Sequence, residues 1–185
     1  MHPFLELILP QFKAHFQPGR DLSIDEAMIG FKGRIFFKQY MPAKPRKWGV
    51  KVCDAATGCC VTFDICTDRA SRQNTGVSLG HEVVDKVASE YYYNQNRLLY
   101  SDRFFASVPL MQHLSQNGTY ACATVMTTRK GLPDEVRRAK LKERGELLQL
   151  QKGPLMATVY KDKCQIYLGN NQPPGMTSPN SSVQD

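Results

Sequence analysis

Apolar residues near the start of the chain recur at helical spacing. Phe4, Leu5, Ile8, Leu9 and Phe12 mark one face of a helix, and the Phe-Gln-Pro-Gly text of residues 16–19 predicts the turn that ends it. This segment is typical of the end of a helical region that lies before the next element.

A strand pattern follows at once. In residues 22–25 apolar and polar side chains alternate, which places Leu22 and Ile24 on one face of a strand and Ser23 and Asp25 on the other. If the strand continues, Asp25 and its neighbour Glu26 cannot both face one site.

The elements beyond residue 48 can be predicted in the same way. Apolar segments and turn signals predict a hairpin of residues 48–53 and 60–67 around a turn at 54–58, a helix within 78–93, and strands at 98–101 and 120–126. Ser107 precedes an apolar helical stripe with Pro109 in its first turn, which predicts a capped helix. The order strand, hairpin, helix, strand, helix, strand indicates an α/β fold, with helices covering a mixed sheet.

Two segments are polar. Residues 137–152 are dense in charge and permissive for a helix, as in a solvated surface segment. Residues 169–185 carry three prolines among serine and asparagine, which predicts a disordered C-terminal tail.

Composition and charge indicate which kinds of partner and which cellular environment the protein is expected to have. The 185 residues suffice for one domain, and the net charge of +7 with a pI of about 9.1 favours a polyanionic partner. No apolar run approaches the roughly 18 residues of a membrane span, and no secretory signal is visible, so we expect an intracellular protein without a membrane partner. The six cysteines lack the paired spacing of a zinc site, so reduced thiols are expected.

Four motifs occur together in one order. They are the acidic strand and basic turn of residues 21–51, Leu-Tyr-Ser-Asp-Arg-Phe-Phe-Ala-Ser at 99–107, Thr-Arg-Lys-Gly-Leu-Pro at 128–133, and Tyr-Lys-Asp-Lys at 160–163. In order and spacing they resemble the catalytic domain of piggyBac-type transposases from about residue 3 to residue 168. The resemblance implies an RNase H-like fold and descent from a cut-and-paste DNA transposase that uses Mg²⁺ at TTAA targets.

The resemblance also implies roles for two aspartates. Asp25 and Asp102 each stand where an apolar strand ends, and they match the first two members of the family's acidic triad, which would hold metal in a two-metal mechanism. Aspartates at strand ends are otherwise usually turn formers or helix caps. The third acid of the triad has no counterpart after Leu168, so we expect weak or vestigial Mg²⁺ binding and a catalytically incomplete core. Arg103 and Ala123 stand where the family commonly has asparagine and glycine.

Basic residues gather on two segments. The first interleaves its cations with Phe36, Phe37, Tyr40 and Trp48, a mixture suited to phosphates and stacked bases, and the second is the basic motif near residue 130. The candidate DNA-binding residues are Lys32, Arg34, Lys38, Lys44, Arg46, Lys47, Lys51, Arg129 and Lys130. The alternative is that the aromatics pack into the core while the cations only solvate a loop.

These observations lead to one main hypothesis and two alternatives. The main hypothesis is a domesticated, transposable element-derived DNA-binding protein of the nucleus, with residues 1–20 as the end of an upstream helical region, 21–168 as an incomplete RNase H-like domain and 169–185 as the tail. The first alternative is an interaction fragment that binds another copy or a related transposase through an exposed sheet face. The second is a decayed element product without a selected role.

Overall fold

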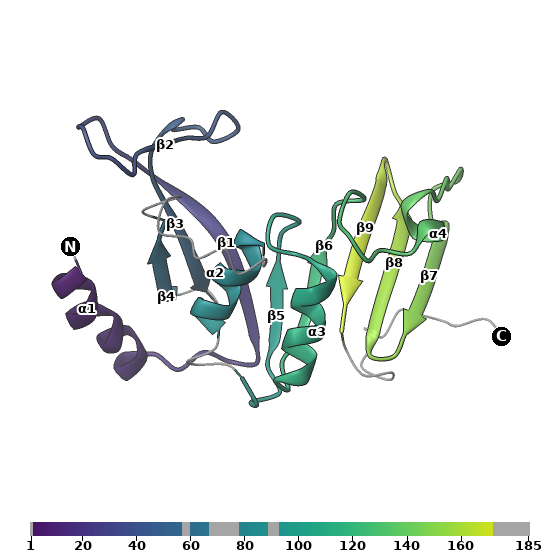
Figure 1. Ribbon diagram of the computed structural model, residues 1–185, viewed down its shortest axis with the longest axis horizontal. Coiled ribbons are helices and arrows are strands. Elements are labelled where there is room, and N and C mark those ends of the chain that lie inside the picture. Colours follow the sequence, from purple (N-terminus) through teal and green to yellow (C-terminus); the bar gives the residue numbers. More distant parts are fainter. Residues whose placement is uncertain (1, 57–59, 67–77, 89–92, 172–185) are drawn as a thin grey trace. The chain divides into compact units, whose positions relative to one another are not determined.

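The computed structural model describes residues 2–56, 60–66, 78–88 and 93–171. The chain divides into two compact units, residues 1–92 and 93–185 (Figure 1). Each unit is described by itself below.

The first unit is built around a long central strand. Strand β3 (Trp48–Ala56) pairs antiparallel with β1 (Asp21–Gly30) on one side, and with β2 (Gln39–Tyr40) and β4 (Cys60–Ile65) on the other. The predicted hairpin of β3 and β4 is confirmed, although its turn at 57–59 lies outside the described residues. Strand β1 extends to Gly30, well beyond the alternating residues 22–25 that predicted it.

Two helices flank the sheet of this first unit. Phe63 and Asp64 are neighbours on β4 and therefore point to opposite faces. The centroid of the Phe63 ring lies 6.2 Å from that of Phe12 in helix α1 (His2–His15). The carboxylate of Asp64 forms a 2.6 Å ion pair with the ammonium of Lys86 in helix α2 (Leu79–Ala88). Each face of this sheet therefore has its own helix.

The core of the first unit follows the predicted alternation. Leu22 and Ile24 of β1 are both 1% exposed, and α2 buries the stripe Val83, Val84 and Val87. Burial of such side chains contributes roughly 1.5–3 kcal/mol each. The apolar spacing that predicted the strand and the helix is therefore also the spacing that forms the core.

The second unit contains a mixed sheet. Its strands are β5 (Leu98–Ser101), β6 (Tyr120–Thr124), β7 (Leu147–Lys152), β8 (Leu155–Lys161) and β9 (Gln165–Asn170), in the order β5-β6-β9-β8-β7 (Figure 1). Strands β5 and β6 are parallel and connected through helix α3 (Val108–Gln116), and the other pairs are antiparallel. The predicted α/β class with a mixed sheet and flanking helices is confirmed.

Helix α3 begins as the sequence predicts. The hydroxyl of Ser107 accepts a hydrogen bond from the main-chain N–H of Leu110 at 3.3 Å, and Pro109 lies in the first turn. Leu110, Met111 and Leu114 are buried. The cap and the apolar stripe together fix where the chain turns back toward β6.

Two predictions for the C-terminal part were wrong in part. The segment 137–152 lies at the surface as predicted, but it is not a helix, because only Asp134–Arg137 forms the short helix α4 and residues 147–152 form β7. The disordered tail was predicted to start at Gly169, but Gly169 and Asn170 end β9 and Asn171 is 1% exposed. The prediction for residues 172–185 lies outside the described part of the chain.

Candidate functional site: acidic strand ends and a basic aromatic loop

Asp25 lies on the exposed face of β1. Its Oδ1 accepts the main-chain N–H of Glu26 at 2.7 Å, and it faces Asp54 across the β1–β3 pairing. Opposed residues of an antiparallel pair have their side chains on one face, so the two carboxylates lie on the same face. Burial, and then the charge of Asp25, raise the pKa of Asp54.

Asp54 was missed in the sequence. It was assigned to the turn of the hairpin, whereas β3 runs on to Ala56 and carries it into the sheet. Only the strand register reveals that it opposes Asp25. The apolar residues Ala55 and Ala56, which continue the apolar segment beyond Asp54, are the signal that could have indicated it.

Glu26 points to the other face, as the alternation predicted. Its carboxylate lies 3.9 Å from the ammonium of Lys51, and both side chains are largely buried. A cation that is only 7% exposed and lies beside a buried carboxylate is poorly placed to contact phosphate, so the structure gives Lys51 a partner within the sheet rather than an open face toward DNA.

Asp102 directly follows β5 and starts a tight turn. Its Oδ1 accepts the main-chain N–H of Arg103 at 2.5 Å and the hydroxyl of Thr124 at 2.9 Å, and its carbonyl accepts the N–H groups of Phe105 and Ala106. Thr124 ends β6, the parallel neighbour of β5. The two strand ends therefore fix the carboxylate of Asp102, while its side chain stays at the surface.

Arg129 supports this turn from the loop after β6. Its Nη2 donates to the carbonyls of Arg103 at 3.0 Å and Phe104 at 2.6 Å. In the same loop as Arg129, Gly131 has φ of +87°, a conformation that glycine adopts without strain. The Arg-Lys-Gly motif thus shapes the backbone beside Asp102, and Lys130 remains exposed.

The structure describes the two predicted catalytic aspartates in different units, Asp25 in the first and Asp102 in the second. Among the described residues, no three His, Cys, Asp or Glu side chains form a cluster that could hold a metal ion. Asp162, within the Tyr-Lys-Asp-Lys motif of residues 160–163, forms a 2.7 Å ion pair with Arg144.

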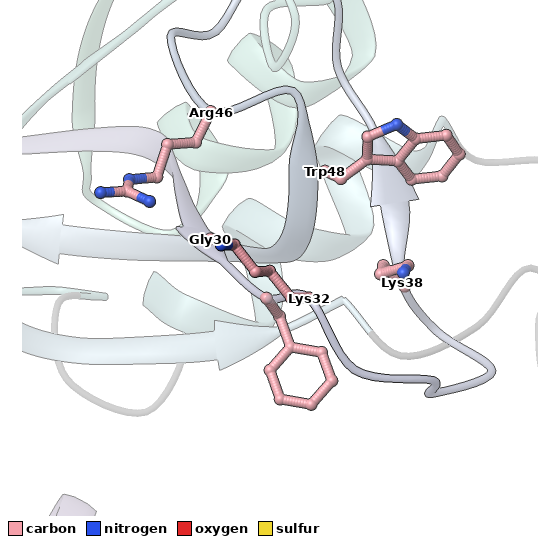
Figure 2. Close-up of a pocket in the computed structure, with 6 residues that line it drawn as sticks. Gly30, Lys32, Lys38, Arg46 and Trp48 are labelled. Atoms are coloured by element: carbon pink, nitrogen blue, oxygen red, sulfur yellow. The ribbon is translucent and has the colours of Figure 1, made fainter.

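The loop between β1 and β3 carries a hollow of about 660 Å³. Figure 2 shows its lining, and the residues around it are Gly30, Phe31, Lys32, Lys38, Arg46 and Trp48. Two aromatic rings and three cations therefore surround one opening within a single loop.

Several contacts order this loop. The Trp48 ring packs against Tyr40 with centroids 4.8 Å apart, and the Lys38 ammonium lies 5.6 Å from the Trp48 centroid and donates to the Gly33 carbonyl at 3.0 Å. Lys44 donates to the Glu26 carbonyl at 2.8 Å and so ties the loop to β1. These two lysines therefore hold the loop together.

The other four cations of the loop are Lys32, Arg34, Arg46 and Lys47. All four side chains are exposed, and none forms an ion pair with another residue that the structure describes. Of the four aromatics noted in the sequence, only Phe37 is buried, while Phe36, Tyr40 and Trp48 are more than half exposed. The alternative in which the aromatics pack into the core therefore holds for Phe37 alone.

Comparison with known proteins places this geometry in a family. A family model described as Transposase IS4 matches residues 1–172. The match and the α/β fold define the class as transposase catalytic domains. The chain belongs to the piggyBac-type transposase family. Membership implies descent from DDE-type nucleases, which generally use a divalent metal.

A solved structure supports the same conclusion. The chain is similar to one in the cryo-EM structure of a piggyBac transposase synaptic complex with hairpin DNA, with a TM-score of 0.84 and 25% identity. The match covers 95% of this chain and 38% of that chain. The predicted resemblance is confirmed, and the present chain spans well under half the length of the matched one.

Proposed function

We propose that this chain is a transposase-derived, DNA-binding domain that acts in the nucleus. The observation that carries the proposal is a group of exposed cations that form no ion pair within the described part of the chain, on a loop that also exposes aromatic rings: Lys32, Arg34, Arg46 and Lys47. Cations without carboxylate partners are available for phosphates, whose neutralisation releases counterions. The DNA in the matched relative's complex supports the same substrate class.

The test is duplex binding by the purified chain at several salt concentrations. A Lys32→Gln/Arg46→Gln variant should bind duplex DNA more weakly than the parent chain. A matched control is Arg137→Gln/Arg138→Gln, which removes the same charge from exposed arginines that are paired with Asp134. Equal weakening by both variants would contradict a role specific to the loop, and the absence of duplex binding by the parent chain would reject the proposal.

We further propose that this chain binds DNA without efficient strand cleavage. Asp25 and Asp102 are the positions inherited from the catalytic triad, and Mg²⁺ requires several well-placed oxygen ligands because it holds its water tightly. When bound, the metal would activate and stabilise oxygens of the phosphodiester. With two of the inherited carboxylates, binding should be weak.

Titration of Mn²⁺ into the chain, and into its Asp25→Asn and Asp102→Asn variants, tests this second proposal. The expected result is weak binding, together with no metal-dependent nicking of DNA. Tight binding that is lost in both variants, with cleavage activity, would show a competent site and overturn the proposal. DNA association should be the same in all three proteins.

A second candidate function is association with another protein chain. It is favoured by a cavity of about 650 Å³ within the second unit, lined by apolar side chains of α3, the loop after β6 and the β7–β8 hairpin. Helix α1 also exposes Phe4 and Leu7 by 64% and 73%. The occupant would be a second copy or a related transposase, and a monomer at all concentrations in light scattering would argue against self-association.

No helix in the described part of the chain is long and apolar enough to cross a membrane.

A further inference from the structure

We propose that the hollow between Phe31 and Trp48 receives an unpaired DNA base. This inference rests on the proposed DNA binding and specifies what the loop recognises. The hollow of about 660 Å³ lies within the range of about 300–1,000 Å³ that small-molecule sites occupy, so it has room for a nucleotide.

The two rings are exposed but fixed. Phe31 is 40% exposed and Trp48 56% exposed, although both belong to an ordered backbone in which the Phe31 N–H donates to the Trp48 carbonyl at 3.4 Å. Trp48 starts β3 opposite Tyr40 and packs on its ring. Because these contacts already order Trp48, less side-chain entropy remains to be lost when a base stacks on it.

Two glycines allow side chains of the loop to pack directly against the main chain. A Cβ at Gly33 would fall 2.6 Å from Cε1 of Phe31, so the ring lies directly over this glycine. A Cβ at Gly30 would fall 2.6 Å from Cδ of Arg46, so the stem of the arginine lies against Gly30. The glycines therefore set the positions of one aromatic wall and one cation.

The charges around the rings match a nucleotide. Lys32 and Arg46 line the hollow, are exposed and form no ion pair among the described residues, while Lys38 lies near the Trp48 ring. Cations beside aromatic faces are the combination that binds single strands, since bases stack on the rings while the cations hold the backbone. A fully paired duplex offers its phosphates but not its base faces.

Trp48 is the only tryptophan of the chain, so its fluorescence reports directly on the hollow. The experiment titrates the full chain with a short oligothymidine and, separately, with a blunt GC-rich duplex of equal length. We expect the single strand to quench Trp48 on binding and the duplex to bind without comparable quenching.

A Phe31→Leu variant should lose about 10-fold in affinity for the single strand, the effect of removing one stacking partner, and keep its affinity for the duplex within about twofold. The matched control is Phe36→Leu, because Phe36 is 83% exposed and does not line the hollow. Gly33→Ala, which displaces the Phe31 ring, should resemble Phe31→Leu, with unfolding curves confirming that all variants fold.

The outcomes separate the two proposals. Duplex binding without any single-strand quenching would overturn the base pocket and leave the proposed function intact. If the parent chain bound neither the single strand nor the duplex, the proposed function itself would be rejected. Equal losses in Phe31→Leu and Phe36→Leu would show general aromatic contact and reject this hollow as the site.

Discussion

At the scale of single residues, two thiols in the first unit form a close pair. The sulfurs of Cys53 and Cys66 lie 3.4 Å apart, and Cys53 is fully buried. The hydrogen bond from Cys53 lowers the pKa of Cys66 to about 7, and the charge of Lys51 acts in the same direction. The same hydrogen bond, and then burial, raise the pKa of Cys53.

Cys66 should therefore react with iodoacetamide at neutral pH. The thiolate is the reactive form, and a lowered pKa means that it is present above about pH 7, so the rate should rise through pH 7 and level off above it. Mass spectrometry of the Cys66 peptide measures this rate. In Cys53→Ala the midpoint should move upward, whereas Cys53→Ser, which keeps a donor, should preserve it, and an unchanged midpoint in Cys53→Ala would contradict the assignment.

Asn171 satisfies several main-chain groups in the second unit. Its amide nitrogen donates to the carbonyls of Met111 and Thr119, each at 3.0 Å, and its Oδ1 accepts the N–H of Ala121. We expect Asn171→Ala to lower the free energy of unfolding by about 2 kcal/mol, since it leaves buried groups without partners. Urea unfolding measures this, and Lys140→Ala, at an exposed position of the same unit, should change it by less than about 0.5 kcal/mol.

At the scale of elements, two glycines are opposed at the last pair of the β1–β3 pairing. Gly30 and Gly49 are opposed in the register, and a Cβ at Gly49 would fall 2.1 Å from the carbonyl oxygen of Ile29. No side-chain rotation relieves a contact with backbone. The β1–β3 pairing, which presents Asp25 and starts the basic loop, therefore depends on glycine at position 49.

Gly49→Ala should destabilise the fold by about 2 kcal/mol or more, because the strands must separate. Gly19→Ala is the matched control, since a Cβ there meets nothing within 4 Å. Thermal unfolding of the two variants gives the comparison. A melting temperature of Gly49→Ala equal to that of the parent chain would contradict the described register.

The elements that the sequence predicted well are those with one clear periodicity. Helix α3 has its cap, its proline and its apolar stripe within ten residues, and β5 is an uninterrupted apolar segment. Strand β7 was missed because Leu148 and Leu150 alternate only briefly with glutamine after a charged segment that also suits a helix. Strand β7 pairs with β8 across the short Gly153-Pro154 turn, and β8 pairs with β9, whereas the β6–β9 pairing joins strands that lie far apart in the sequence and that no local pattern indicates.

For the candidate site, too, local patterns indicated some residues, while contacts between distant segments could not be predicted. The identity of Asp25 and Asp102 followed from motifs, and the exposed cations followed from local composition. The opposition of Asp25 and Asp54, the burial of Lys51 and the support of the Asp102 turn by Arg129 depend on contacts between strands and loops. Such contacts are set by tertiary register, which a local pattern does not specify.

At the scale of the whole molecule, many basic residues contribute to the net charge of +7, and among the residues that the structure describes Lys32, Arg34, Arg46 and Lys47 of the basic loop form no ion pair. If the four unpaired cations of the basic loop each neutralise one phosphate, log K for duplex DNA should fall with log salt concentration at a slope of about −3.6.

Removal of two of them in Lys32→Gln/Arg46→Gln should make the slope shallower by about 1.8. Fluorescence anisotropy with a labelled duplex at 50 to 200 mM salt, the range over which the relation is about linear, measures both slopes. The Arg137→Gln/Arg138→Gln protein should keep the parent slope. A slope that does not change in the loop variant would mean that phosphate contacts lie elsewhere.

The alternation of Asp25 and Glu26 on β1 has an evolutionary consequence. One faces outward beside Asp54 and the other inward against Lys51, so substitution at either position alters one side of the sheet only. Insertion or deletion of a single residue within β1 would instead exchange the two faces along the rest of the strand. Lineages of this domain should therefore accumulate point changes in β1 while its length stays constant, with length variation confined to the connecting loops.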